Sequence, residues 1–252
     1  MEPRRTEQFP LNRADMPGSK RSLADIAIFA APAIFVVLWA SGFVGAKLGL
    51  PYAEPMTFLA IRMGAVVILI GAISLATRPV WPSRMGVIHS IVTGLFVHGC
   101  YLGGVFFSID HKLPAGLSAL VVSLQPVLTS TLANRLLGER VMLRQWLGLA
   151  LGIVGVYLVV HGRTEGEAPL IAWFGATVAL VGMTIGTLYQ KRFCPAFDLR
   201  TGSVLQFLPC LALTGALALA ETQPVRCTGD FVFALAWLVL VLSLGAVNLL
   251  NL

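Results

Sequence analysis

The chain has 252 residues, of which 57% are hydrophobic and only 12% are charged, and its formal net charge is +6. Ordinary soluble domains have about 45–50% apolar and about 25% charged residues. Because a soluble core could not hide this much apolar surface, the composition excludes a soluble globular domain and predicts an integral membrane protein.

Residues 1–22 form a polar segment ahead of the first apolar run. The segment, MEPRRTEQFPLNRADMPGSKRS, has no apolar core and does not match a cleaved signal peptide. Ser22 and Asp25 stand at capping-box spacing, which predicts that the first helix begins near Leu23. We therefore expect a short, disordered cytoplasmic tail.

Eight apolar runs follow this tail. Each is long enough to cross about 30 Å of hydrocarbon as an α-helix, and the short connectors hold many of the Pro, Gly and charged residues. The runs cover residues 26–50, 55–76, 85–109, 114–137, 143–160, 168–189, 201–220 and 231–252. The sequence predicts an all-α integral membrane protein, a helical bundle of about eight transmembrane helices with no extramembrane domain.

The basic residues orient this bundle. With the N-terminus in the cytoplasm, thirteen Lys and Arg residues near the inner face oppose four near the outer face, as the positive-inside rule requires. The outer four are Lys47, Lys112, Arg163 and Arg226. Basic residues that face anionic lipid headgroups account for the net charge. No basic stretch is interleaved with aromatic residues, so we predict membrane lipid and no nucleic acid as a partner.

Signatures of catalysis and metal binding are missing from the sequence. The four cysteines lack the close pair spacing of a zinc or redox site, and His89 and His98 are too far apart on one helix for a shared metal ion. A packing or pore-lining role is favoured for both histidines. The carboxylates lie in tails, loops and helix ends, which argues against an intramembrane enzyme. We predict no enzymatic activity, no cofactor and no metal.

An internal repeat relates the two halves of the chain. A shift of 144 residues pairs residues of similar chemistry six times, and a shift of 142 lays Leu-Gly-Gly-Val at 102–105 over Leu-Gly-Ala-Val at 244–247. The six pairs are Gly42 with Gly186, Lys47 with Lys191, Pro51 with Pro195, Glu54 with Asp198, Thr57 with Thr201, and Arg62 with Gln206. Because five helices separate the copies, the second repeat is inverted relative to the first, as in many secondary transporters.

Arg62 is the eighth residue of the apolar run 55–76, roughly 10 Å along its helix. An Arg that faces lipid at the bilayer centre costs about 2.5–3.5 kcal/mol on insertion scales, so an Arg within a span more often faces a polar cavity or a partner. The alternative is a side chain that snorkels to the outer interface. We predict that Arg62 faces the bundle interior, where it holds an anionic or zwitterionic group of a substrate or fixes the outer gate through Glu54.

Other residues inside the apolar runs are candidates for substrate binding or gating. Lys47 would add to the positive field of Arg62, and Gln206 is the repeat counterpart of Arg62. Trp39 and Tyr101 are amphipathic side chains within spans. Pro126, next to Gln125, lies about midway through its run, where it would free a backbone carbonyl. A gating or cavity role for these two residues and a static kink remain equally open.

Two stretches carry a family resemblance. LWASGFVGAKLGLPYAEPMTFLAIR at 38–62 and SALVVSLQPVLTSTLANRLLGERVMLRQWLGLALGIVGVYLVV at 118–160 resemble the EamA-type transporters of the drug/metabolite transporter superfamily. The second stretch joins the helix with Pro126, a Gly-Glu-Arg turn at 138–140 and a Gly-spaced helix. The resemblance implies two inverted five-helix repeats that export or import small metabolites without ATP, in a bacterial inner membrane.

The family pattern divides the chain into a tail at 1–22, a first EamA-like repeat of five helices at 23–162 and a partial second repeat of three helices at 163–252. Counterparts of the fourth and fifth helices are not found in the second repeat, so we expect a C-terminally truncated member. Our first hypothesis for the function is an exporter of small metabolites or drug-like solutes. The alternative is a truncated, non-transporting membrane protein or a structural or regulatory membrane subunit.

Glycine pairs four residues apart predict close helix packing, either within one chain or in a homodimer. The pairs are Gly99 with Gly103, Gly148 with Gly152, and Gly182 with Gly186. The Gly148 and Gly152 face is our candidate for a homodimer contact, because a shortened second repeat would leave helical surface unpaired.

Overall fold

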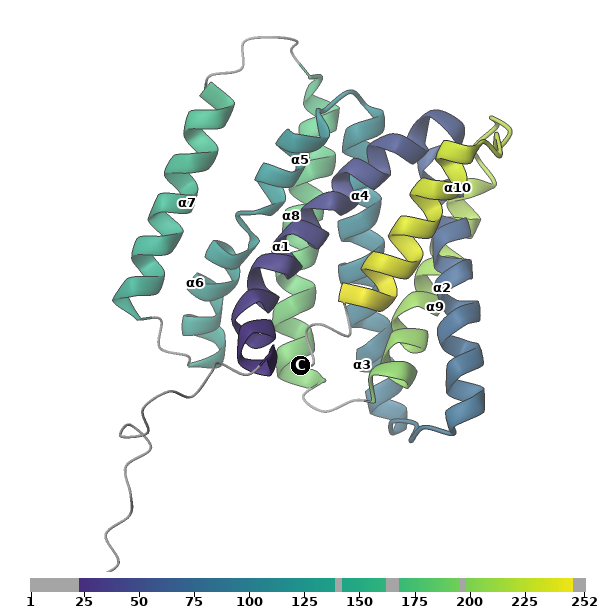
Figure 1. Cartoon of the computed structure of the whole chain (residues 1–252), viewed down its shortest axis with the longest axis horizontal. Helices are drawn as coiled ribbons and strands as arrows, with labels where there is room; N and C mark the ends of the chain where they lie inside the picture. The colour runs from purple at the N-terminus through teal and green to yellow at the C-terminus, as the bar shows by residue number, and fades with distance from the viewer. Residues whose placement is uncertain (1–22, 139–141, 162–167, 195–197, 247–252) are drawn as a thin grey trace, which may run out of the picture.

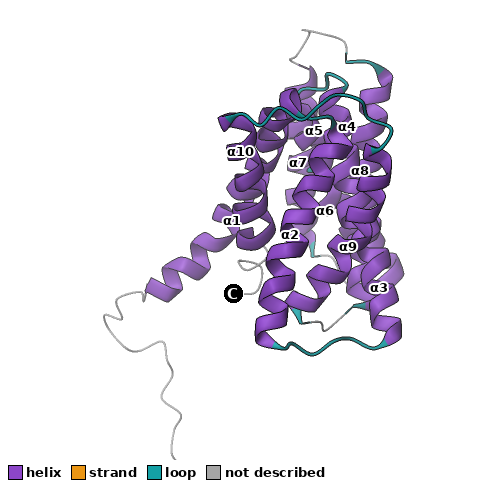
Figure 2. Ribbon diagram, turned by 90° about the vertical axis from the view of Figure 1, so that its right-hand side faces the viewer, coloured by secondary structure: helices purple, strands orange, loops and turns teal. Residues whose placement is uncertain are grey.

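The computed structural model describes residues 23–138, 142–161, 168–194 and 198–246, and it contains helices and connecting loops but no strands in those ranges (Figures 1 and 2). The α-helices are α1 (Leu23–Gly49), α2 (Pro55–Thr77), α3 (Arg84–Gly94), α4 (Tyr101–Asp110), α5 (Ala115–Val122), α6 (Gln125–Leu137), α7 (Leu143–His161), α8 (Leu170–Phe193), α9 (Leu199–Ala218) and α10 (Gly229–Ala236). Three further segments join them, the 3-10 turn η2 (Leu50–Tyr52) and the π-helical segments η3 (Leu95–Cys100) and η4 (Trp237–Ala246). The expected tail lies outside the described residues.

The described helices agree with the apolar runs. Six helical segments are long and apolar enough to cross a membrane, where α3, η3 and α4 together form one segment and α5 and α6 together form another. Two shorter apolar helices cover Leu143–Gly155 and Gly229–Ser243. Each of the eight runs therefore contains a helix. The prediction of an all-α membrane bundle is confirmed.

The run that contains Pro126 is not a single helix. α5 ends at Val122, α6 begins at Gln125, and Pro126 occupies the first turn of α6. A proline in a first turn removes no intrahelical hydrogen bond, because that N–H has no partner in any case. The expectation that Pro126 lies midway through a continuous helix is wrong, because it stands at the start of α6.

The most extensive contact between described helices is that of α2 and α9, which lie side by side in opposite directions (Figure 1). α8 packs against α3, η3 and α4, while α1 packs against α10 and η4. The core between these helices contains Phe58, Leu59 and Met63 of α2 and Phe106 of α4, all buried. α7 stands at the edge of the bundle, next to α5.

Glycines allow closest approach where α4 meets α8. A methyl group on Gly104 would lie 2.5 Å from the carbonyl oxygen of Gly175 and 2.8 Å from the backbone nitrogen of Ala179. Of the glycines predicted to pack, Gly182 and Gly186 do contact η3, through Cys100 and Val97. By contrast, Gly103, Gly148 and Gly152 have no neighbour within 4 Å of the position that a methyl group would take. A homodimer through the open face of α7 stays a prediction.

At one end of the bundle the start of α2 is tied to the loop between α9 and α10. The Glu221 carboxylate accepts hydrogen bonds from the backbone N–H groups of Met56 (2.8 Å) and Thr57 (2.7 Å), and Glu54 accepts one from the backbone of Thr222 (3.1 Å). We call these contacts the Glu221 clamp. Glu221 caps a helix from a distant part of the chain, where a carboxylate also suits the positive end of the helix dipole. Glu54 contacts Thr222 and not Arg62, so this structure does not join Arg62 and Glu54 in a gate.

We expect Glu221→Ala to lower the free energy of unfolding by about 2 kcal/mol, because two charge-assisted hydrogen bonds to the α2 N-terminus are lost. Glu221→Gln, which keeps one acceptor oxygen, should lose about half as much. Thermal unfolding of the purified protein in detergent measures both. Gln223→Ala, at an exposed position of the same loop, is the control, and a loss for this variant equal to that for Glu221→Ala would contradict the role of the clamp.

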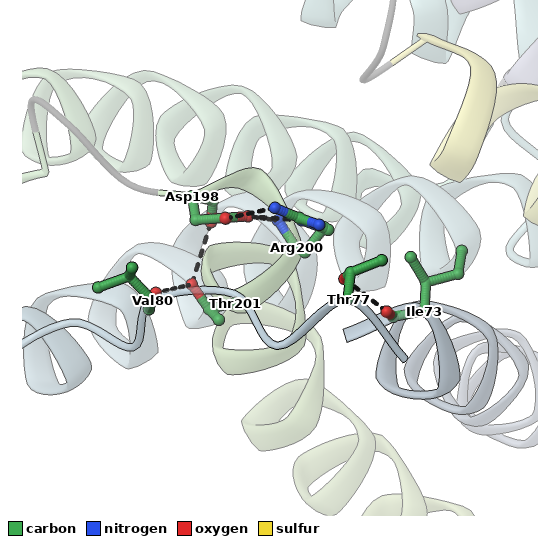
Figure 3. A network of polar contacts seen from close by, with 6 residues as sticks. All are labelled: Ile73, Thr77, Val80, Asp198, Arg200 and Thr201. Atoms are coloured by element: carbon green, nitrogen blue, oxygen red, sulfur yellow. Dashed lines mark hydrogen bonds and ion pairs between the residues drawn. The ribbon is translucent and has the colours of Figure 1, made fainter. Parts of the chain in front are cut away.

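At the opposite end, the start of α9 is held against the loop that follows α2 (Figure 3). Asp198 accepts hydrogen bonds from the Arg200 backbone (2.9 Å) and guanidinium, and the Thr201 hydroxyl donates to the carbonyl oxygen of Val80 (3.3 Å). The side-chain and backbone hydrogen bonds from Arg200 hold the pKa of the Asp198 carboxyl below its ordinary value. Thus α2 begins after Glu54 and α9 after Asp198, an acidic pair that the repeat alignment also matched.

Candidate cavity around Arg62

A cavity of about 110 Å³ lies inside the bundle, several times the space that one water molecule needs. Residues from α1, α2, α4, α9 and both π-helical segments line it: Phe35, Trp39, Gly42, Phe43, Arg62, Val97, His98, Tyr101, Leu102, Val105, Phe106, Phe207, Leu242 and Ser243. Most of these are apolar or aromatic. The ionisable side chains among them are Arg62, His98 and Tyr101. A largely apolar cavity with a few polar groups that converge on it is typical of a small-molecule site.

Arg62 is the permanent cation of this cavity, and its guanidinium group makes few hydrogen bonds. Its side chain is 6% exposed. One terminal nitrogen, Nη2, donates a long hydrogen bond of 3.4 Å to the Ser243 hydroxyl, and Nε has no hydrogen-bond partner among the residues that the structure describes. The ion pairs between side chains of the described residues join Arg200 to Asp198 and His111 to Asp110, and neither involves Arg62.

The burial of Arg62 decides between two hypotheses for its side chain, one in which it faces the bundle interior and one in which it snorkels to the interface. A snorkelling side chain would extend from the bundle toward the interface, whereas protein atoms surround this one and its guanidinium lines the cavity. A buried guanidinium that has no carboxylate partner has lost its hydration, and few protein interactions offset this cost. The arrangement can accept an oxyanion in two parallel N–H···O hydrogen bonds.

Aromatic rings form the walls beside Arg62. Trp39 stacks on Tyr101 with ring centroids 5.9 Å apart, and Phe35 lies 5.3 Å from Trp39. The His98 ring, which also lines the cavity, stacks on Phe207 with ring centroids 4.0 Å apart. Flat rings offer a large apolar contact area with little conformational freedom to lose. The walls suit an apolar or aromatic body attached to the group that Arg62 would hold.

Both π-helical segments contribute residues to the cavity, and the repeat predicted from the sequence pairs the two segments with each other. A shift of 142 residues moves η3 (Leu95–Cys100) onto the first six residues of η4. The same shift carries Tyr101 onto Ser243, and both line the cavity. The Ser243 hydroxyl donates to the carbonyl oxygen of Leu238, five residues back (3.0 Å). Single π-helical turns occur frequently at functional sites, because they redirect side chains out of the regular helical order.

The structure brings together three of the seven residues that the sequence singled out, namely Arg62, Trp39 and Tyr101. Gln206 is next to the wall residue Phe207, and its side chain lies within hydrogen-bonding reach of His98.

The remaining three residues lie elsewhere. Gln125 donates hydrogen bonds to Thr129 (2.9 Å) and Thr187 (3.4 Å), at the junction that contains Pro126. Lys47 lines a separate surface hollow together with Asp110 and Lys112. Lys47 and Arg62 therefore do not share one cavity in this structure.

Sequence reasoning missed Ser243 and Phe207 as wall residues. The repeat itself contains a signal for Ser243, because the shift that aligns 102–105 with 244–247 also pairs Tyr101 with Ser243. For Phe207 the signal is its position directly after Gln206, the counterpart of Arg62.

Curated relatives of this chain are designated as transporters or efflux pumps. The uncharacterized transporter YvbV of Bacillus subtilis is 26% identical over 85% of this chain and 74% of its own length. A probable amino-acid metabolite efflux pump of Salmonella typhimurium is 27% identical over 63% of this chain and 52% of its own length. The uncharacterized inner membrane transporter YedA of Escherichia coli is 23% identical over 71% of this chain and 58% of its own length. The chain thus spans little more than half the length of the last two relatives.

The family assignment rests on a match to more than half of the chain. Residues 25–161, from α1 to the end of α7, match the model of the EamA-like transporter family. This region contains both stretches that carried the resemblance and the residues Trp39, Arg62, His98 and Tyr101 of the cavity. The chain is a multi-pass membrane protein that belongs to the EamA-like transporter family.

Proposed function

We propose that the protein is a secondary transporter that exports small metabolites with a carboxylate or similar anionic group, and that the cavity around Arg62 is its substrate site. The observation that carries the proposal is the buried guanidinium with a free Nε and one long hydrogen bond. A substrate anion would give Arg62 the partner that the described residues do not provide. The protein acts as a carrier and not as an enzyme.

The chemistry of the cavity supports an oxyanion. Charge-assisted hydrogen bonds from a guanidinium to a carboxylate are roughly twice as strong as neutral ones, and they come in pairs. Inside an apolar cavity the attraction is screened less than in water. The substrate of this proposal is thus a small amphipathic molecule, anionic or zwitterionic, with its carboxylate at Arg62 and its body between the rings of Trp39, Tyr101 and Phe207.

An inverted repeat with the substrate at its interface would provide alternating access. We assign the first repeat to residues 23–162 and the second to residues 163–252. In the repeat alignment α1 corresponds to α8, α2 to α9, α3 to α10 and η3 to η4. The contact of α1 with α10 and η4 therefore corresponds to the contact of α8 with α3, η3 and α4, and both contacts exist. Because α2 and α9 are each other's counterparts, the contact between them corresponds to itself. This pattern is what a pseudo-two-fold axis between α2 and α9 produces.

Export is the direction favoured by the designation of one relative, the probable amino-acid metabolite efflux pump of Salmonella typhimurium. The alternative, a structural or regulatory membrane subunit, needs packing surfaces alone. An interior cavity with an unsatisfied cation is costly for such a subunit, and this favours the transporter.

Transport by the purified protein in lipid vesicles tests the proposal. The solutes are 3-phenyllactate, phenylalanine and phenethylamine, which share one ring and carry an anionic, a zwitterionic and a cationic head. We expect movement of at least one of the two carboxylate solutes above the rate of protein-free vesicles. If phenethylamine moves and neither carboxylate does, the assignment of the site is wrong. If none of the three solutes moves, the result supports the alternative function, a structural or regulatory membrane subunit.

Labelling of Cys227 tests the orientation that we propose, with a cytoplasmic N-terminus in the inner membrane. Cys227 is exposed in the loop between α9 and α10, whereas Cys194 and Cys210 are buried and Cys100 is partly buried. We expect a membrane-impermeant maleimide, added outside intact cells, to label the wild-type protein and not Cys227→Ser. If label enters Cys227 only after the membrane is permeabilised, the orientation is the reverse.

A further inference from the structure

The charges that face the cavity are of one sign. Arg62 is positive, and the other ionisable side chains of the wall, His98 and Tyr101, add no negative charge near neutral pH. Both lie in electrostatic contact with Arg62. No Asp or Glu is present among the described lining residues, and the sequence from residue 244 to 252 contains none either.

We infer that this cavity selects molecules with a net negative charge, apolar or aromatic monocarboxylates, over zwitterionic amino acids of the same size. The selectivity rests on the transport function proposed above and narrows its substrate class. A carboxylate finds the free Nε donor of Arg62. An α-ammonium group on the same molecule would be held within a few ångströms of the guanidinium, with a wall of rings and aliphatic side chains around it.

The ammonium group would then lose its hydration without gaining an anionic partner. A buried charge is tolerated when it is paired and hydrogen-bonded, and it is otherwise strongly disfavoured. The acceptors near Arg62 are few, because the described lining residues include no carboxylate and the Ser243 hydroxyl oxygen already accepts from Arg62 Nη2 (3.4 Å). Contact with the faces of Trp39 or Tyr101 would recover part of the loss. A neutral hydroxyl at the same carbon carries no such penalty.

The matched pair 3-phenyllactate and phenylalanine isolates this difference, because a hydroxyl replaces the ammonium at one carbon and the rest is identical. Binding of each solute to the wild-type protein in lipid nanodiscs, measured at pH 7.5, should give at least tenfold tighter binding of 3-phenyllactate. Equal affinities, or tighter binding of phenylalanine, overturn the selectivity and leave the transport proposal intact. Binding of neither solute overturns both, so the two failures are distinguishable.

A change of charge in the wall provides the second test. His98→Glu places a carboxylate on η3, in the wall that contains Arg62, and so supplies the acidic partner that an ammonium needs. The ratio of the two affinities should move at least tenfold toward phenylalanine in this variant. His98→Gln, of the same length and neutral, should keep the wild-type order of preference. If the ratio moves equally in both variants, the charge of the wall does not set the selectivity.

Discussion

Arg62→Gln should weaken binding of 3-phenyllactate by roughly 10- to 100-fold, because a charge-assisted pair of hydrogen bonds of about 1.5–3 kcal/mol is lost. Arg62→Lys should lose about tenfold, since an ammonium keeps the charge but not the planar pair of donors. Lys47→Gln, which removes a cation from the separate outer hollow, should change the affinity less than threefold. The measurement is equilibrium binding to each variant in nanodiscs.

The stability of the same Arg62 variants distinguishes a binding site from a structural anchor. In the substrate-free protein the guanidinium is buried and has no acidic partner among the described residues. Its replacement by the neutral Gln should therefore raise the free energy of unfolding by about 1–2 kcal/mol. A lower unfolding temperature for Arg62→Gln, together with unchanged binding, would show that Arg62 holds the bundle together and does not hold a substrate.

Gly104→Ala should lower the free energy of unfolding by about 1–3 kcal/mol, whereas Gly103→Ala should be neutral or stabilising by up to about 1 kcal/mol. The added methyl group on Gly104 would meet backbone atoms of α8, and backbone cannot move aside as a side-chain tip can. On Gly103 the same methyl group meets nothing within 4 Å. Thermal unfolding in detergent measures both changes.

The two glycine variants also test how α4 positions the cavity. α4 begins with Tyr101, which forms part of the wall with Trp39. If α4 is displaced from α8, that stacked pair should shift, and substrate affinity should fall in Gly104→Ala and not in Gly103→Ala. Two variants that unfold at the same temperature would mean that α4 and α8 do not approach as closely as described.

Some features of the site follow from local sequence and others do not. A cation in an apolar run is conspicuous in a linear sequence, and so Arg62 was identified without a structure. Whether that cation has a partner depends on residues far along the chain, because Ser243, its hydrogen-bond partner within the described part of the chain, is 181 positions away. For the same reason Lys47, close to Arg62 in the sequence, was assigned to the same positive field although it lines a different hollow.

The sequence by itself determined the membrane environment, the eight apolar helices and the family, since hydrophobicity, run length and motifs are summed along the chain and need no knowledge of packing. It also predicted a repeat that pairs Arg62 with Gln206. Only the tertiary structure decided that Gly104 and not Gly103 meets α8, that Glu221 caps α2, and that the helix breaks before Pro126. Those outcomes depend on which face each helix turns to its neighbours. Inside a lipid bilayer both faces of a helix can be equally apolar, so hydrophobic periodicity does not reveal the face.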